Sequence, residues 1–201
     1  MFVALKEEAT SMYSAREAGL TYCRKIIQLS SKSIRNVHRH DYESARALLV
    51  EARQAAEQAR AFLQPHPELY FAGYLHDAEK EYVEAAAVLA MATGQSVPTP
   101  SELGAQPMSY LNGLGEAASE MRRYVLDEMR AGRLGEAERL LHEMEFIYDE
   151  LIAFDFPDAM TGGLRRTCDA LRAVIERTRS DLTLTQSQSA LIHELQQFRS
   201  E

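Results

Sequence analysis

The segment Glu81-Tyr-Val-Glu-Ala-Ala-Ala-Val-Leu-Ala-Met-Ala92 has a clear helical pattern in this 201-residue chain. From Ala85 to Ala92 it contains no polar side chain, and its alanine, leucine and methionine favour a helix. A helix that is apolar on every side must be covered by its neighbours. The pattern therefore predicts a helix, about 68–93, whose apolar part is buried on most sides.

The rest of the chain also has a helical pattern. It contains 10 Gly and 6 Pro, and no segment shows sustained alternation of apolar and polar residues. We therefore predict an all-α fold, a bundle of six to seven antiparallel and mostly long helices. Residues 1–182 are expected to form one domain, and the polar residues 183–201 a frayed tail or a short extra helix. The other predicted helices span about 3–39, 41–63, 109–131, 134–153 and 164–182.

Several features predict a cytoplasmic protein with no membrane association. No apolar run approaches the roughly 20 residues that cross a bilayer. The N-terminal region carries Glu7 and Glu8 where a signal peptide would be apolar. Cys23 and Cys168 lack the spacing of a metal site, so we interpret them as small buried residues in a reducing compartment.

Two acidic pairs are the candidate metal ligands. Glu81 and Glu84 share a helix face because they are three residues apart. Such pairs are commonly solvated, but these border the apolar stretch, where carboxylates need a cation or basic group to compensate their lost hydration. Glu116 and Glu120 lie on the predicted helix 109–131, and their spacing also fits an ordinary amphipathic helix.

The type of metal follows from the ligands. None of the six histidines has a Glu three residues before it, which disfavours a di-iron site. Four carboxylates would suit a hard cation, Mg²⁺ or alternatively Mn²⁺. Helix packing would have to bring the two acidic pairs together.

A basic segment stands out from the net charge of −8. That net charge argues against general nucleic-acid binding, but residues 18–40 contain no acidic residue. Their basic side chains could hold phosphates. A solvated helix face or a subunit contact explains them equally well. The candidate nucleic-acid-binding residues are Lys32, Arg35, His38 and Arg39.

Four segments, in this order and spacing, resemble the translin family, and specifically a prokaryotic or archaeal-like member of its translin-associated factor X (Trax) type. They are Ser33-Ile-Arg-Asn-Val-His-Arg39, Glu81-Tyr-Val-Glu-Ala85, Tyr110-Leu-Asn-Gly-Leu-Gly-Glu-Ala-Ala-Ser-Glu-Met-Arg-Arg123 and Leu164-Arg-Arg-Thr-Cys-Asp-Ala-Leu-Arg172.

The resemblance implies an all-α fold, large hollow homo-oligomers that are commonly octamers, and binding of single-stranded RNA or DNA inside the shell. Trax-type members resemble Mg²⁺-dependent endoribonucleases, whereas translin-type members bind and scaffold. The family's catalytic and metal-binding acids fall on Glu81, Glu84, Glu116 and Glu120. Glu116 stands where the family often has Asp, so its carboxylate lies one C–C bond, about 1.5 Å, further from the backbone.

The sequence thus predicts a Mg²⁺-dependent endoribonuclease that acts on single-stranded RNA. A non-catalytic shell that binds single-stranded RNA or DNA is the first alternative. A helical assembly protein without a nucleic-acid role is the second.

Overall fold

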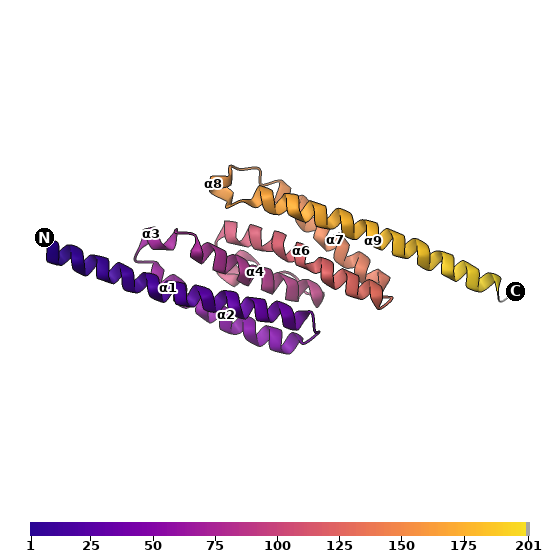
Figure 1. Cartoon of the computed structure of the whole chain (residues 1–201), viewed down its shortest axis with the longest axis horizontal. Helices are drawn as coiled ribbons and strands as arrows, with labels where there is room; N and C mark the ends of the chain where they lie inside the picture. Colours follow the sequence, from indigo (N-terminus) through magenta and orange to yellow (C-terminus); the bar gives the residue numbers. More distant parts are fainter. Residues whose placement is uncertain (200–201) are drawn as a thin grey trace. The chain divides into compact units, whose positions relative to one another are not determined.

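The computed structural model describes residues 1–199, and these residues form helices joined by short loops (Figure 1). Within this range there is no strand, which confirms the predicted all-α fold class. The long helices are α1 (Phe2–Val37), α2 (Tyr42–Leu63), α4 (Tyr74–Ala92), α6 (Pro107–Arg130), α7 (Leu134–Ile152) and α9 (Leu164–Phe198). Three helices of four residues each are α3 (Pro67–Tyr70), α5 (Pro100–Leu103) and α8 (Asp158–Thr161).

The chain divides into two compact units, Met1–Leu114 and the part that begins at Gly115. Helix α6 starts in the first unit and continues without a break into the second.

In the first unit, α1 and α2 pack along each other, and α4 packs against both. The inner face of α2 consists largely of alanines, so its neighbours can approach closely. Gly19 of α1 permits one such approach, since a Cβ at this position would lie 2.5 Å from Cδ2 of the fully buried Leu63. The core around these helices includes Cys23, Ile26, Leu29, Leu75, Tyr82 and Val83.

Helix α4 begins at Tyr74, so the predicted start near Glu68 is wrong. Pro67 begins the separate helix α3, which ends at Tyr70. Gly73 then has φ +100°, a left-handed conformation that turns the chain into α4. Its apolar stretch is buried as expected, with every residue from Ala85 to Met91 at most 6% exposed.

In the second unit, α7 packs against α9. The predicted end of the last long helix near residue 182, followed by a frayed or separate tail, is wrong because α9 continues to Phe198. The tail contains no Gly or Pro that would end the helix. The hydroxyl groups of Thr185 and Ser187 donate to the backbone carbonyls of Asp181 (2.8 Å) and Thr183 (2.9 Å), one turn earlier in the same helix. Residues 200 and 201, also part of the predicted tail, lie outside the described residues.

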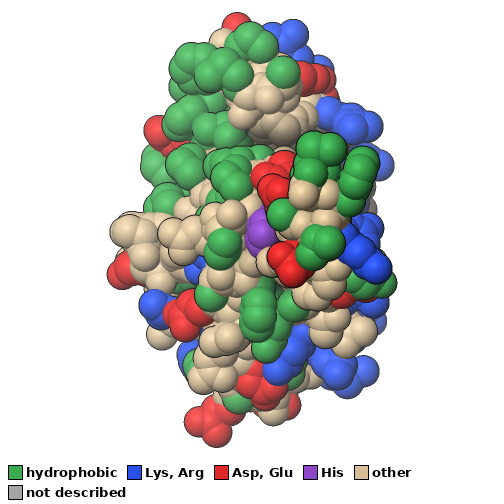
Figure 2. Space-filling model, turned by 90° about the vertical axis from the view of Figure 1, so that its left-hand side faces the viewer, with side chains coloured by type: hydrophobic (Ala, Val, Ile, Leu, Met, Phe, Trp, Pro, Cys, Tyr) green, Lys and Arg blue, Asp and Glu red, His purple; other side chains and the backbone are tan. Residues whose placement is uncertain are grey.

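The end of α7 and the segment between it and α9 expose several apolar side chains, which are Ile152, Phe154, Phe156 and Met160. Figure 2 shows hydrophobic side chains gathered near the top of one face of the molecule. Across residues 1–199, the helices are too short or too polar to span a bilayer.

Candidate metal centre

Helix α4 carries two different faces at the point where the acids lie. Tyr82 and Val83 are buried, at 3% and 0% exposure. Glu81 and Glu84 flank them and are half-buried. The side chains of these two acids therefore point away from the α1–α2 core, along the edge predicted from the sequence.

Gly113 brings the start of α6 against this edge of α4. A Cβ atom on Gly113 would lie 2.7 Å from the carbonyl oxygen of Lys80 and 2.7 Å from Cβ of Val83. Real Cβ contacts are longer, so the two helices can meet this closely only at a glycine. Glu116 follows three residues later on the same unbroken helix and so shares the helix face of Gly113.

The packing brings three predicted ligands together. One carboxylate oxygen from each of Glu81, Glu84 and Glu116 lies within 4.8 Å of the others, and all three residues are half-buried. The additional methylene of Glu116 does not keep its carboxylate out of the group. Glu120, one turn further along α6, is also half-buried but does not belong to this group.

The chemistry of this group fits a divalent cation. Three carboxylates so close together repel one another unless a positive charge compensates them. Mg²⁺ binds oxygen ligands at about 2.1 Å in octahedral geometry, so its ligand oxygens lie about 3 to 4 Å apart. The observed limit of 4.8 Å is within a small side-chain movement of that spacing. In residues 1–199 no other three His, Cys, Asp or Glu side chains bring ligand atoms this close together.

Glu79 is a further acid with a structural role, which the sequence pattern did not reveal. It is completely buried on α4 and accepts two hydrogen bonds, from Nε of Arg60 (2.7 Å) and from the backbone N–H of Gln106 (3.0 Å). These bonds connect α2, α4 and the segment that leads into α6. The available signal was its position, since Glu79 shares a helical face with the core residues Leu75 and Tyr82.

The predicted nucleic-acid-binding residues lie at the C-terminal end of α1. Lys32, Arg35 and Arg39 are exposed. Lys32 and Arg35 are three residues apart on one side of α1, and Arg39 lies in the turn that follows the end of the helix at Val37. Nη1 of Arg35 donates to Oγ of Ser31 (2.9 Å). His38 is half-buried at the C-cap of α1, so it faces solvent less than the other three.

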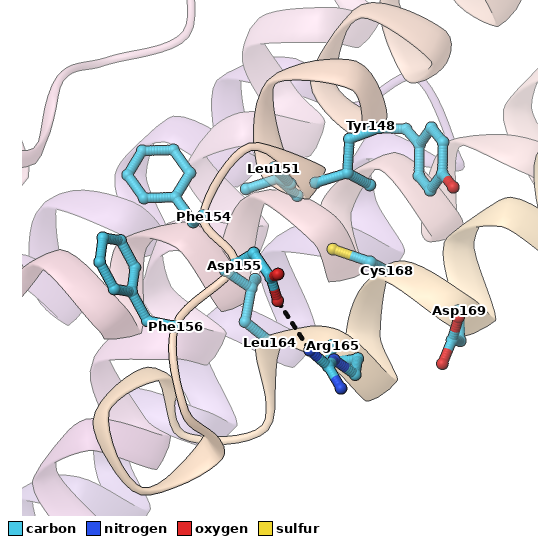
Figure 3. A pocket seen from close by; sticks show the side chains of 10 residues that line it. Tyr148, Leu151, Phe154, Asp155, Phe156, Leu164, Arg165, Cys168 and Asp169 are labelled. Carbon is cyan, nitrogen blue, oxygen red and sulfur yellow. Dashed lines mark hydrogen bonds and ion pairs between the residues drawn. The ribbon is translucent and has the colours of Figure 1, made fainter.

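A cavity of about 170 Å³ in the second unit offers no comparable chemistry (Figure 3). Phe154 and Phe156 line its loop side, and Arg165 forms an ion pair with Asp155 (2.7 Å). Burial and then the charge of Asp169 raise the pKa of the Cys168 thiol, so this cysteine is a poor nucleophile.

The chain is similar to several known proteins, although no family model matches it. It is 31% identical over 171 residues to the uncharacterized protein MJ0175 of Methanocaldococcus jannaschii, covering 84% of this chain and 75% of that protein. A structure of AfC3PO in complex with duplex RNA is 34% identical, with a TM-score of 0.88, and the match covers 93% of this chain and 97% of that one. The structure of apo-NeC3PO has a TM-score of 0.83 at 24% identity, over 92% and 96% of the two chains, and supports the fold.

The helical fold defines an all-α protein of translin type. The chain belongs to the translin family, which includes the C3PO proteins, as the sequence motifs predicted.

Proposed function

We propose that this chain is a Trax-type, Mg²⁺-dependent endoribonuclease that acts on single-stranded RNA. The observation that carries the proposal is the group of three half-buried carboxylates on α4 and α6. A scaffold that only binds RNA has no need for three acids at this spacing, because they repel each other and the phosphates of the ligand.

In this proposal Glu81, Glu84 and Glu116 hold Mg²⁺, and Mn²⁺ can replace it. When bound, the cation would lower the pKa of a water molecule and polarise the scissile phosphate. Glu120 lies on the same side of α6 as Glu116, one turn further on, and would orient a ligand or water at the rim of the site.

RNA is the proposed substrate because AfC3PO forms a complex with duplex RNA, and its sequence is 34% identical to that of this chain. We propose that cleavage requires a single strand, whose flexible backbone can bring a phosphate to half-buried acids more readily than a stiff duplex. Lys32, Arg35 and Arg39 would bind phosphates further along the strand, with His38 at their edge. Their contribution would decrease as salt increases.

The ends of both long terminal helices support self-association into a large homo-oligomer, which we propose to be octamer-like. Phe2, Val3 and Leu5 at the start of α1 are 55–78% exposed, and Leu191, Ile192 and Leu195 near the end of α9 are 55–60% exposed. Apolar groups this exposed commonly mark protein interfaces. The mass of the native particle in solution tests this part of the proposal. A cytoplasmic location stays a prediction of the sequence.

The test uses labelled single-stranded RNA with purified protein, with and without Mg²⁺. We expect internal cleavage with Mg²⁺, loss of cleavage in Glu81→Ala and in Glu84→Ala, and retained RNA binding in both variants. Cleavage at the parental rate by both variants would refute the site.

The alternative is a non-catalytic oligomeric scaffold that binds single-stranded RNA or DNA. Binding alone is enough to form the complex of AfC3PO with duplex RNA, and this complex therefore favours the scaffold as well. Salt-sensitive binding of the labelled strand, without cleavage at any Mg²⁺ or Mn²⁺ concentration, would support this alternative.

A further inference from the structure

A cavity of about 400 Å³ lies in the first unit, where α2 ends and α3 begins. This volume is within the range of small-ligand sites in proteins. The metal centre does not use the residues around it. They are Arg60, Gln64, Pro67, Tyr70 and Phe71.

Arg60 lines this cavity, and its side chain has one unused hydrogen-bond donor. Its Nε is held by buried Glu79, and its Nη1 lies 3.0 Å from where a Cβ atom on Gly104 would be. Its Nη2 is buried without a hydrogen-bond partner. A buried donor in this state lacks the stabilisation that an acceptor would provide.

The charge of Arg60 is already compensated by Glu79, which is 0% exposed. A second full negative charge at the guanidinium would therefore meet the repulsion of that carboxylate. A neutral acceptor, such as a carbonyl oxygen, fits the free donor better than a phosphate does.

Two aromatic rings complete the cavity. Phe71 is 74% exposed, and its ring centroid lies 5.1 Å from that of Tyr70 at an interplanar angle of 71°. The cavity is thus lined by an exposed aromatic ring, a guanidinium and the amide of Gln64. These groups can bind an unstacked nucleobase through stacking and hydrogen bonds.

We propose that this cavity receives one unstacked nucleobase of bound RNA. The base stacks on Phe71, and a ring carbonyl oxygen accepts a hydrogen bond from Nη2 of Arg60 after a small movement of that side chain. Uracil, cytosine and guanine carry such a carbonyl and adenine does not, so the site favours the first three. This inference rests on the proposed function, since it assumes that the protein binds RNA.

The experiment compares the binding of fluorescein-labelled oligo(U) and oligo(A) by the full-length protein in EDTA, so that no cleavage occurs. Phe71→Ala is expected to weaken oligo(U) binding by roughly five-fold or more, the lower end of what one lost base stack costs. Phe71→Trp should restore it. Phe146→Ala, which removes another exposed phenylalanine (61%) far along the sequence, is the matched control and should bind like the parent.

Equal oligo(U) binding by the parent and Phe71→Ala would overturn the inference, as would a Phe71→Trp variant as weak as Phe71→Ala. A loss of oligo(A) binding as large as the loss of oligo(U) binding would overturn the assigned preference. If the parent cleaves RNA with Mg²⁺ while Phe71→Ala binds normally, the cavity inference fails and the proposed function stands. If the parent binds no RNA, both fail.

Discussion

A Cβ atom on Gly113 would lie 2.7 Å from the carbonyl oxygen of Lys80, so the backbones of α6 and α4 are in direct contact at this pair. The contact occurs one helical turn before Glu116 on α6 and within one turn of Glu81 and Glu84 on α4. The absence of a side chain at Gly113 is therefore what allows acids from two helices to approach a common point.

We predict that Gly113→Ala separates the helices and removes Mg²⁺-dependent cleavage while the protein remains folded. The new methyl group meets backbone, which cannot move aside as a flexible side chain can, so a loss of about 1–3 kcal/mol in unfolding free energy is expected. Chemical denaturation and a cleavage assay measure the two effects.

The matched control for this variant is Gly135→Ala. Gly135 lies in α7, and a Cβ there would have no atom within 4 Å. The substitution should leave cleavage unchanged and stabilise the protein by up to about 1 kcal/mol, because alanine is the better helix former. Equal effects of the two substitutions would contradict the assigned role of Gly113.

Removal of one carboxylate from the group of three should abolish the rise in melting temperature that Mg²⁺ causes. In EDTA, the melting temperatures of Glu84→Gln and the parent give the metal-free reference for each protein. Mg²⁺ should raise the Tm of the parent, since a ligand that binds the folded state stabilises it, but not that of the variant. Thermal unfolding in both buffers measures this, with exposed Glu51→Gln as the control. An equal Mg²⁺-induced shift in Glu84→Gln would place the cation elsewhere.

Glu79→Ala should destabilise the protein far more than any substitution among the three clustered acids. It leaves Arg60, whose side chain is 20% exposed, without its carboxylate partner and leaves the N–H of Gln106 without its acceptor. Removal of one partner of such a buried ion pair lowers the unfolding free energy by about 3–5 kcal/mol. Urea denaturation of this variant beside Glu57→Ala, which removes an exposed ion pair with Arg53, gives the comparison. A similar small loss in both variants would refute the structural role of Glu79.

Cys23 should be unreactive in the folded protein at neutral and mildly alkaline pH. Burial, followed by the charges of Glu79 and Asp77, raises the pKa of its thiol from 9.0 to about 11. The unfolded chain ionises first as pH rises, so this thiol's contribution to stability is complete below about pH 9 and is lost between about pH 9 and 11. Thiol-modification rates across this range, with and without denaturant, test the prediction. Rapid modification of folded protein at pH 8 would contradict it.

The sequence predicts the burial of α4 well because one local property, the apolar run from Ala85 to Ala92, determines it. The edge position of Glu81 and Glu84 follows from the same run. The approach of Glu116 to these two acids does not follow from the apolar run, because it depends on a backbone contact between two helices. Two glycines inside a predicted helix, Gly113 and Gly115, were the available signal, because glycine is unfavourable there without a packing reason.

The buried Glu79 and the break at Gly73 show the same limit. Glu79 looks like a member of the acidic pattern around it, and its burial depends on Arg60, nineteen residues away. The separation of α3 from α4 depends on the positive φ of Gly73, which composition alone does not determine. The continuation of α9 past residue 182 could have been predicted from the sequence. The segment is polar, which suggested a tail, but it contains no helix-breaking residue.

The most direct test of the metal centre is a crystal of the protein soaked in Mn²⁺ and measured for anomalous scattering. We expect a Mn²⁺ peak within coordination distance of carboxylate oxygens from Glu81, Glu84 and Glu116, and no such peak in crystals of Glu84→Gln. An empty site in the parent at saturating Mn²⁺, or a peak that persists in Glu84→Gln, would contradict it.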